Sequence, residues 1–261
     1  MAKYLVLDTE TTGGLGHPLA YDVGGVVMEE NGYIVERFHW AVLEIIGNPA
    51  LMASAFYAEK MPLYWQEVYK GHIRPLYFSD ILRKITALVD FHDITAIAAY
   101  NAGFDNRSMT ETCEYLFDNK NWLNRDVPIW DIWAGACNSV LNTEKFIKWA
   151  VKTQNFSEKM NPRTNAEVCF QYITGNGKFA EEHTGGRDAE IEAAILAAIL
   201  RRKKRPDFTI VGGPWRKPAA LFKEMRDAGK ISKTDLFLLE NRDIAPEDGP
   251  HHYQTTNNRL D

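Results

Sequence analysis

Two carboxylates near the start of the chain are the first residues that could do chemistry. Asp8 and Glu10 stand two positions apart, after the apolar run Tyr4–Leu7. Side chains at positions i and i+2 of a strand point to the same side of a sheet, so both would lie on one face. Two such carboxylates repel each other, and the pKa of each rises unless a cation lies between them. The pair therefore fits a cation site, although a solvated strand end can have the same sequence.

A second candidate segment is Asn101–Asp105, which follows the apolar run Ile94–Tyr100. Asn101 is suited to cap a helix, and Asp105 would then complement the positive end of the helix dipole. A helix N-terminus alone does not explain the position of Asp105 in the chain. The carboxylate follows the C-terminal end of a predicted strand, which is where sites in open α/β sheets tend to lie.

The third candidate segment runs from His183 to Asp188. His183 precedes Gly185 and Gly186, and Asp188 heads a strongly apolar helical stretch. A single histidine in a loop is usually a surface residue, so this pair, like the other two segments, gains meaning only in combination.

Taken together, the three segments resemble the motifs of the histidine (DEDDh) branch of the DnaQ-like 3′–5′ exonucleases, in the ribonuclease H-like superfamily. Asp8–Gly13 is similar to the first motif, Asn101–Asp105 to the second, and His183 with Asp188 to the third. The tyrosine branch places its tyrosine four positions before the aspartate, where this chain has Thr184. The resemblance covers about residues 4–200 and does not extend to residues 206–261.

The resemblance implies a two-metal-dependent 3′–5′ exonuclease that acts on single-stranded DNA and releases nucleoside 5′-monophosphates. Asp8 would bridge two divalent cations, Glu10 and Asp188 would hold the one beside the attacking water, and Asp105 would support the other. All four donors are carboxylates, which select hard ions such as Mg²⁺ or Mn²⁺. His183 would be the general base, since an ordinary imidazole pKa near ~6.5 allows proton uptake near neutrality.

Residues around these motifs are candidates for contacts with the terminal nucleotide. They are Thr9, Thr11, Thr12, Asn101 and Phe104. Phe104 could equally be a core residue. The chain also departs from the family pattern: a glycine, Gly14, precedes Leu15, Tyr100 stands where relatives often have histidine, and Gly24-Gly25 replaces larger residues. These departures concern the grip on the 3′ end rather than the metal site.

The elements that must position these residues indicate an α/β fold with a mixed five-stranded sheet flanked by helices, ribonuclease H-like in type. Asn31-Gly32 is a strong hairpin signal between two of the strands, so the first three would form an antiparallel meander and the last two would be parallel. The predicted strands are Tyr4–Leu7, Gly24–Met28, Tyr33–Val42, Ile94–Tyr100 and Pro128–Trp133.

Three helices have recognisable start signals in the sequence. Ser79 is suited to cap one helix, and Thr164 with Glu167 has the spacing of a capping box. A third helix is predicted from Asp188 to about Lys203, with acidic residues at its start and the basic run Arg201–Arg205 at its end.

The chain changes character after residue 205. We therefore expect a DEDDh exonuclease catalytic domain over residues 1–205. Residues 206–261 would form a C-terminal appendage with two short helices, near residues 219–228 and 233–241, and a polar tail.

Amino-acid composition limits the classes of protein to which this chain can belong. The net charge of −5 argues against non-specific coating of DNA. The three cysteines, Cys113, Cys137 and Cys169, form no C-x-x-C motif, and no secretory signal is recognisable, so we expect a cytoplasmic protein. The longest apolar run, Ala193–Leu200, is too short to span a membrane.

Several alternatives stay open at this level. The substrate could be RNA, because both polymers use the same metal chemistry. The chain could be a proofreading module bound to a polymerase, a homodimer, or a nucleic-acid-binding module without activity. The last is disfavoured because all five residues of the predicted site are present.

Overall fold

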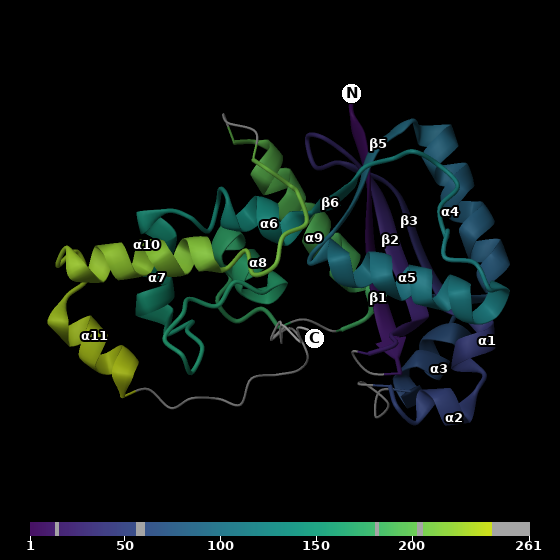
Figure 1. Ribbon diagram of the computed structural model, residues 1–261, viewed down its shortest axis with the longest axis horizontal. Coiled ribbons are helices and arrows are strands. Elements are labelled where there is room, and N and C mark those ends of the chain that lie inside the picture. Colours follow the sequence, from purple (N-terminus) through teal and green to yellow (C-terminus); the bar gives the residue numbers. More distant parts are fainter. Residues whose placement is uncertain (14–15, 56–60, 181–182, 203–205, 242–261) are drawn as a thin grey trace, which may run out of the picture.

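The computed structural model of the protein describes residues 1–13, 16–55, 61–180, 183–202 and 206–241. Within these residues, six strands form one mixed sheet in the order β4-β3-β2-β1-β5-β6, and helices cover both of its faces (Figure 1). The strands are β1 (Lys3–Thr12), β2 (Leu19–Glu29), β3 (Ile34–Val42), β4 (Arg74–Leu76), β5 (Ile94–Ala99) and β6 (Ile129–Asp131).

The predicted antiparallel meander and the two parallel strands are confirmed. β1 pairs antiparallel with β2, and β2 pairs antiparallel with β3. Gly32 makes the tight turn with a φ of 94°, a conformation that favours glycine. β5 is parallel to β1, and β6 is parallel to β5.

The sheet holds one strand more than the sequence analysis expected. β4 is a three-residue edge strand parallel to β3, and it contains Pro75. Such a short segment shows no alternation of apolar and polar residues, and proline occurs in strands mainly at edges. The pattern therefore gave no signal for it.

Alternation along β1 assigns its side chains to two separate cores. Tyr4 and Val6 belong to one apolar cluster, and Leu5 and Leu7 belong to the other. Because the period of a strand is two residues, Asp8 and Glu10 continue the face of Tyr4 and Val6.

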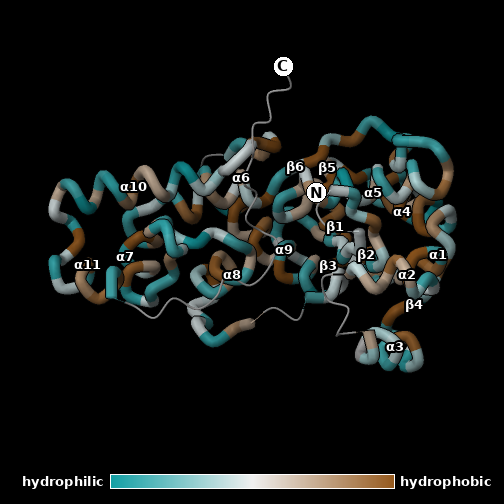
Figure 2. Tube along the Cα trace, turned by 60° about the horizontal axis from the view of Figure 1, so that its bottom comes forward, coloured by the Kyte–Doolittle hydropathy of each residue, from teal (hydrophilic) through white to brown (hydrophobic). Residues whose placement is uncertain are grey.

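The helices are α1 (Leu43–Ile46), α2 (Pro49–Met52), α3 (Met61–Tyr69), α4 (Phe78–His92), α5 (Ala102–Phe117), α6 (Ile132–Cys137), α7 (Glu144–Thr153), α8 (Ala166–Thr174), α9 (Gly185–Leu200), α10 (Arg216–Asp227) and α11 (Lys233–Glu240). Helices α4 and α5 lie on one face of the sheet and α9 lies on the other, whereas α7, α10 and α11 pack together farther from the sheet (Figure 1). Figure 2 shows hydrophobic and hydrophilic residues alternating along the helices.

The predicted helix caps at Ser79 and Thr164 are wrong, and tertiary contacts explain both. Helix α4 begins at Phe78, whose backbone N–H donates to both oxygens of the Glu44 carboxylate at 3.1 and 3.0 Å. At α8 the cap is Asn165. The Thr164 hydroxyl accepts a hydrogen bond from the Trp133 indole at 2.9 Å.

Helix α9 begins three residues earlier than predicted and ends at Leu200, with Arg201 as its C-cap. Residues 203–205, which complete the predicted basic run, lie outside the described residues, as does the tail from residue 242.

The two helices expected after residue 205 are present as α10 and α11, beside α7 (Figure 1). Phe208, Phe222 and Leu239 are buried in the same apolar cluster as Tyr4 and Val6. The Phe208 carbonyl accepts from the backbone N–H of Asp131 at 2.9 Å. Residues 206–240 thus share a core with the sheet, and the domain boundary at residue 205 stays a prediction.

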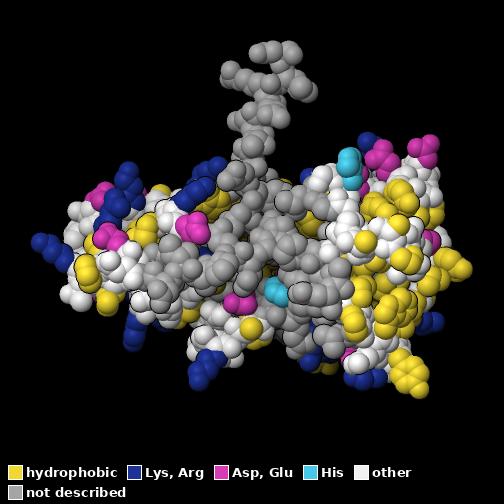
Figure 3. Space-filling view, turned by 90° about the horizontal axis from the view of Figure 1, so that it is seen from below, with side chains coloured by type: hydrophobic (Ala, Val, Ile, Leu, Met, Phe, Trp, Pro, Cys, Tyr) yellow, Lys and Arg dark blue, Asp and Glu magenta, His cyan; other side chains and the backbone are white. Residues whose placement is uncertain are grey.

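The surface is uneven in character. Figure 3 shows hydrophobic side chains gathered at the end that carries α1 to α5, and Lys and Arg side chains at the end that carries α10 and α11. Within the described part of the chain, every helix is too short or too polar to cross a membrane.

Candidate active site

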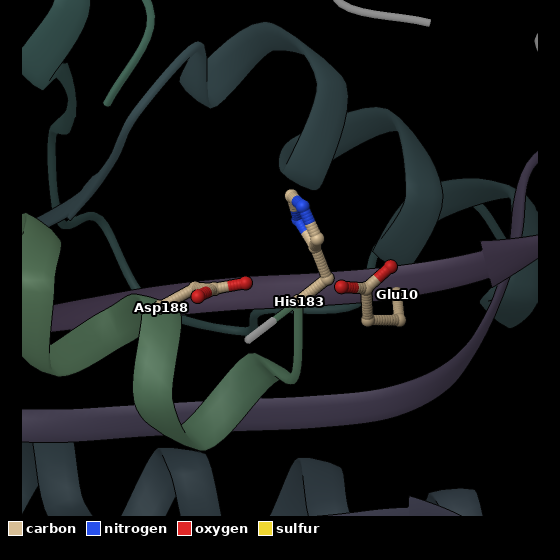
Figure 4. A group of neighbouring side chains, drawn as sticks. All are labelled: Glu10, His183 and Asp188. Atoms are coloured by element: carbon tan, nitrogen blue, oxygen red, sulfur yellow. The ribbon is translucent and has the colours of Figure 1, made fainter. Parts of the chain in front are cut away.

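Three of the predicted site residues converge in space. Glu10, His183 and Asp188 each offer a ligand atom, and these atoms lie within 4.8 Å of one another (Figure 4). Glu10 comes from β1, His183 from the segment before α9, and Asp188 from the first turn of α9. Residues from the two ends of the resemblance therefore meet at one point.

Local backbone conformation directs the His183 segment toward the strand. His183 has a φ of 54°, which is uncommon for a residue with a side chain. Thr184 is the N-cap of α9, and its carbonyl accepts from the backbone N–H groups of Arg187 and Asp188 at 3.0 and 2.9 Å. Only Thr184 separates His183 from the first residue of α9, and ligand atoms of His183 and Asp188 lie within 4.8 Å of each other.

Glycines allow α9 to begin directly against the sheet. A Cβ added at Gly24 of β2 would lie 1.8 Å from the carbonyl carbon of Gly185. A Cβ added at Gly185 would lie 2.7 Å from the Gly24 nitrogen. Both distances are shorter than any tolerable contact, so the departure from larger residues at Gly24 has a structural reason here.

Asp8 lies among other carboxylates. Part of its side chain still reaches solvent, yet its pKa is raised well above the ordinary value. The largest cause is desolvation, followed by the negative charges of Glu192, Asp105, Asp188 and Glu10. Several carboxylates in one place destabilise the charged state of each unless a cation neutralises them.

Asp105 is held in place by Thr9. Its Oδ1 accepts from the Thr9 backbone N–H at 3.0 Å and from the Thr9 hydroxyl at 2.9 Å. Burial raises the pKa of Asp105 to about 7, although the bonds from Thr9 act in the opposite direction. Asp131 adds a further negative charge that raises it.

Two buried carboxylates beside the site were missed by the sequence analysis. Glu192 lies one turn after Asp188, and its Oε2 accepts from the Tyr100 backbone N–H at 2.9 Å. Asp131 accepts from the backbone N–H groups of Asn101 at 3.1 Å and Trp133 at 2.9 Å. Burial raises the pKa of Asp131 to about 6, although these bonds lower it. The available signals were a third acid, after Asp188 and Glu190, at the start of an apolar helix, and an acid at a strand end.

The residues predicted to contact the nucleotide have different surroundings. Thr9 is buried and its donors go to Asp105. Thr12 is fully buried, and its hydroxyl contacts the Leu51 carbonyl and the Ser54 hydroxyl. Thr11, Asn101 and Phe104 are half-buried. The structure thus leaves Thr11, Asn101 and Phe104 better placed than Thr9 and Thr12 to meet a ligand through their side chains.

Asn101 and Phe104 lie at the start of α5. Asn101 is the N-cap of the helix with a φ of 66°, and its side chain makes no capping bond. The predicted cap position is therefore correct, but the capping hydrogen bond is not made. The Arg107 guanidinium lies 5.9 Å from the centre of the Phe104 ring.

The donor set fits a hard divalent cation. Glu10 and Asp188 offer carboxylate oxygens within reach of a single ion, together with the imidazole of His183. Asp8 and Asp105 add two more carboxylates, whose pKa values are raised first by burial and then by neighbouring negative charges. Oxygen-rich sites of this kind suit Mg²⁺ or Mn²⁺.

Comparisons with known proteins give matches among solved structures alone. No family model matches the sequence, and no curated protein is similar to it. The chain aligns with E. coli Exonuclease I in complex with a 5cy-dT13 oligonucleotide, with a TM-score of 0.48 and 15% identity, over 92% of this chain and 45% of that one. It aligns with E. coli Exonuclease I in complex with a dA16 oligonucleotide, with a TM-score of 0.47 and 14% identity, over 91% of this chain and 45% of that one. A product-bound exonuclease I gives a TM-score of 0.47 and 16% identity, over 87% and 46%. The chain thus spans less than half the length of each of these proteins.

Proposed function

We propose that this protein is a metal-dependent 3′–5′ exonuclease of the DnaQ-like histidine branch. It would hydrolyse phosphodiester bonds at the 3′ end of single-stranded DNA and release nucleoside 5′-monophosphates. The observation that carries the proposal is the convergence of Glu10, His183 and Asp188 within 4.8 Å. These residues come from two motifs far apart in the sequence. The negative charges of Asp105, Asp188 and Glu10 all help to raise the pKa of Asp8 beside them.

The carboxylates would hold two divalent cations, Mg²⁺ or Mn²⁺. Asp8, Glu10, Asp105 and Asp188 are the proposed ligands. When bound, the cations neutralise the phosphate and lower the pKa of water. Contacts within the protein hold two of these carboxylates in place. Thr9 orients Asp105, and the first turn of α9 orients Asp188.

His183 is the proposed general base. A water oxygen attacks phosphorus, the bond to the 3′ oxygen breaks, and His183 takes the proton of the water. The imidazole lies within 4.8 Å of the oxygens of Glu10 and Asp188, so it is close to where that water would stand. Thr11, Asn101 and Phe104 are the proposed contacts to the terminal nucleotide.

Degradation of labelled polymers tests the proposal. Single-stranded DNA and RNA of matched sequence, labelled at the 5′ end, are incubated with Mg²⁺, Mn²⁺ or EDTA. We expect a metal-dependent ladder that shortens from the 3′ end of DNA, absent for Asp8→Ala and retained for the matched control Asp227→Ala, a carboxylate of the distant helix α10. Faster degradation of RNA would change the substrate class. No cleavage of either polymer by folded, metal-loaded protein would refute the proposal.

Other features of the setting remain predictions from sequence. They are the cytoplasmic location, the catalytic domain ending at residue 205, and a homodimer or polymerase partner. Co-purification and sedimentation would test the partners.

A further inference from the structure

A buried carboxylate that the proposed mechanism does not use lies behind the site. Asp22 belongs to β2, and its side chain has no exposed surface. Its Oδ2 accepts hydrogen bonds from three other elements: from His39 Nε2 of β3 at 2.9 Å, from the Tyr64 hydroxyl of α3 at 2.8 Å, and from the Gly185 backbone N–H of α9 at 3.1 Å. His39 Nε2 also lies 2.8 Å from Oδ1. A buried carboxylate is costly unless it is hydrogen-bonded, and these three bonds offset that cost.

The bond to Gly185 reaches the first residue of α9. The first N–H groups of a helix have no partner within the helix, and the helix dipole favours a negative charge beside them. Asp22 supplies both the acceptor and the charge. Gly185 follows His183 by two positions and precedes Asp188 by three, so this bond fixes the backbone between the two site residues.

Close packing restricts the same turn of the helix. The first turn of α9 lies against Gly24 of β2, as the distances given above require. A Cβ added at Gly186 would lie 2.8 Å from the His39 ring, which itself donates to Asp22. The start of α9 is thus packed closely against Asp22, Gly24 and His39.

Asp22 is also in register with β1, the strand that carries the proposed metal ligand Glu10. Asp22 pairs with Glu10 across the β1–β2 ladder. The Asp22 carboxylate therefore connects β2, at the position opposite Glu10, to the first turn of α9. That turn carries Asp188 and follows His183.

We propose that Asp22 is a positioning residue that sets His183 and Asp188 relative to Glu10. The proposal rests on the proposed function. A displacement of about 1 Å in a catalytic group can cost about 10²-fold in rate, so an anchor of this kind has a direct consequence for turnover.

The substitution Asp22→Asn tests the proposal because it keeps the side-chain volume. The amide removes the negative charge beside the start of α9 and puts an NH₂ group where Oδ1 now lies 2.8 Å from His39 Nε2, so the charge-assisted contact with His39 is lost. We expect kcat on single-stranded DNA to fall by about 10–100-fold with KM unchanged. Hydrogen exchange of the backbone amides of residues 185–188 should become faster, and this readout does not depend on activity.

Glu44→Gln is the matched control. Glu44 also binds the first amide of a helix, at Phe78 of α4, but that helix carries none of the proposed site residues. We expect it to lower the melting temperature while kcat stays as in the wild type. If Asp22→Asn does not fold, Tyr64→Phe takes its place and is read by the same measurements, because it removes one hydrogen bond to Asp22 and leaves the site residues unchanged.

The outcomes separate the two proposals. A loss of kcat in Asp22→Asn but not in Glu44→Gln, with faster exchange at residues 185–188, supports the positioning role. Unchanged kcat, or unchanged exchange at these amides, overturns it. If the wild type degrades neither polymer, the proposed function fails, and Mn²⁺ affinity decides the positioning role: about tenfold weaker binding in Asp22→Asn supports it, and equal binding overturns it.

Discussion

At the scale of single residues, the contact between Thr9 and Asp105 explains how one strand serves two sides of the site. Asp8 and Glu10 point toward α9, whereas Thr9, on the opposite face, donates twice to Asp105 of α5. The threonine is therefore better described as a support for a proposed metal ligand than as a nucleotide contact. The chemistry of the site then depends on a residue that touches neither the proposed metals nor the substrate.

His183→Ala should lower kcat by about 10²–10⁴-fold, because a general base contributes an effect of that size. Mn²⁺ affinity should stay close to that of the wild type, since the carboxylates remain. Single-turnover rates on single-stranded DNA and a Mn²⁺ titration measure the two effects. His72→Ala, an exposed histidine of the turn after α3, is the matched control. A near-normal kcat for His183→Ala would show that His183 is not the general base.

Thr9→Val should reduce activity by about tenfold, because it removes one of the two donors that orient Asp105. The backbone N–H remains, so the loss of unfolding free energy should be about 1 kcal/mol. Thr9→Ser restores the hydroxyl and should restore the rate. The measurements are initial rates and urea denaturation. Equal rates for the valine and serine variants would contradict this role.

At the scale of elements, the site depends on how closely α9 approaches the sheet. The first turn of α9 packs directly against β2. This is possible because Gly24 of the strand and Gly185 of the helix have no side chains at the contact. No larger side chain fits at this contact, because a Cβ on either glycine would meet the backbone of the other. The position of Asp188 is therefore determined by backbone packing as much as by the helix itself.

Gly24→Ala should destabilise the protein by about 1–3 kcal/mol, as overpacking of a tight contact does. It should also weaken Mn²⁺ binding, since Gly185 must move away. Gly16→Ala is the matched control, because a Cβ there has nothing within 4 Å. Urea denaturation and Mn²⁺ titration compare the two variants. A Gly24→Ala protein as stable as the control would show that the contact is looser than described.

At the scale of the whole molecule, negative charge is concentrated where β1, α5 and α9 meet, while Lys and Arg side chains lie at the α10–α11 end (Figure 3). The net charge of −5 therefore gives little information about the site. Without metal, the carboxylates there oppose the folded state, and both pH and cations should change its stability.

The metal-free protein should become less stable as the pH rises from acid to neutral. Folding raises the pKa of Asp105 to about 7 and that of Asp131 to about 6, from an ordinary value of 3.8. The folded state then binds protons that the unfolded chain has released, so this stability is present at low pH and is lost as the pH rises through 6 and 7.

Thermal denaturation in EDTA at about pH 5 and about pH 8 measures this difference. We expect a lower melting temperature at the higher pH, and recovery on addition of Mg²⁺, because a ligand that binds only the folded state stabilises it. Asp8→Asn should reduce both effects. A melting temperature that does not respond to Mg²⁺ would contradict a cation site in this cluster.

The sequence alone determined the features that depend on neighbouring residues. The period of two in β1 put Asp8 and Glu10 on one face, and Asn31-Gly32 identified the turn between β2 and β3. These two features are set by local backbone geometry, so a linear reading can recover them. The five residues proposed for the site came instead from the resemblance of three motifs to a known family.

Only the tertiary structure decided which groups meet across the fold. Glu44 took the place of the Ser79 cap, a three-residue edge strand completed the sheet, and Asp22 and Glu192 joined the surroundings of the site. A buried carboxylate becomes favourable only when donors from other elements surround it. Those donors, such as the Gly185 N–H, are far away in the chain, and no local pattern records the distance between them.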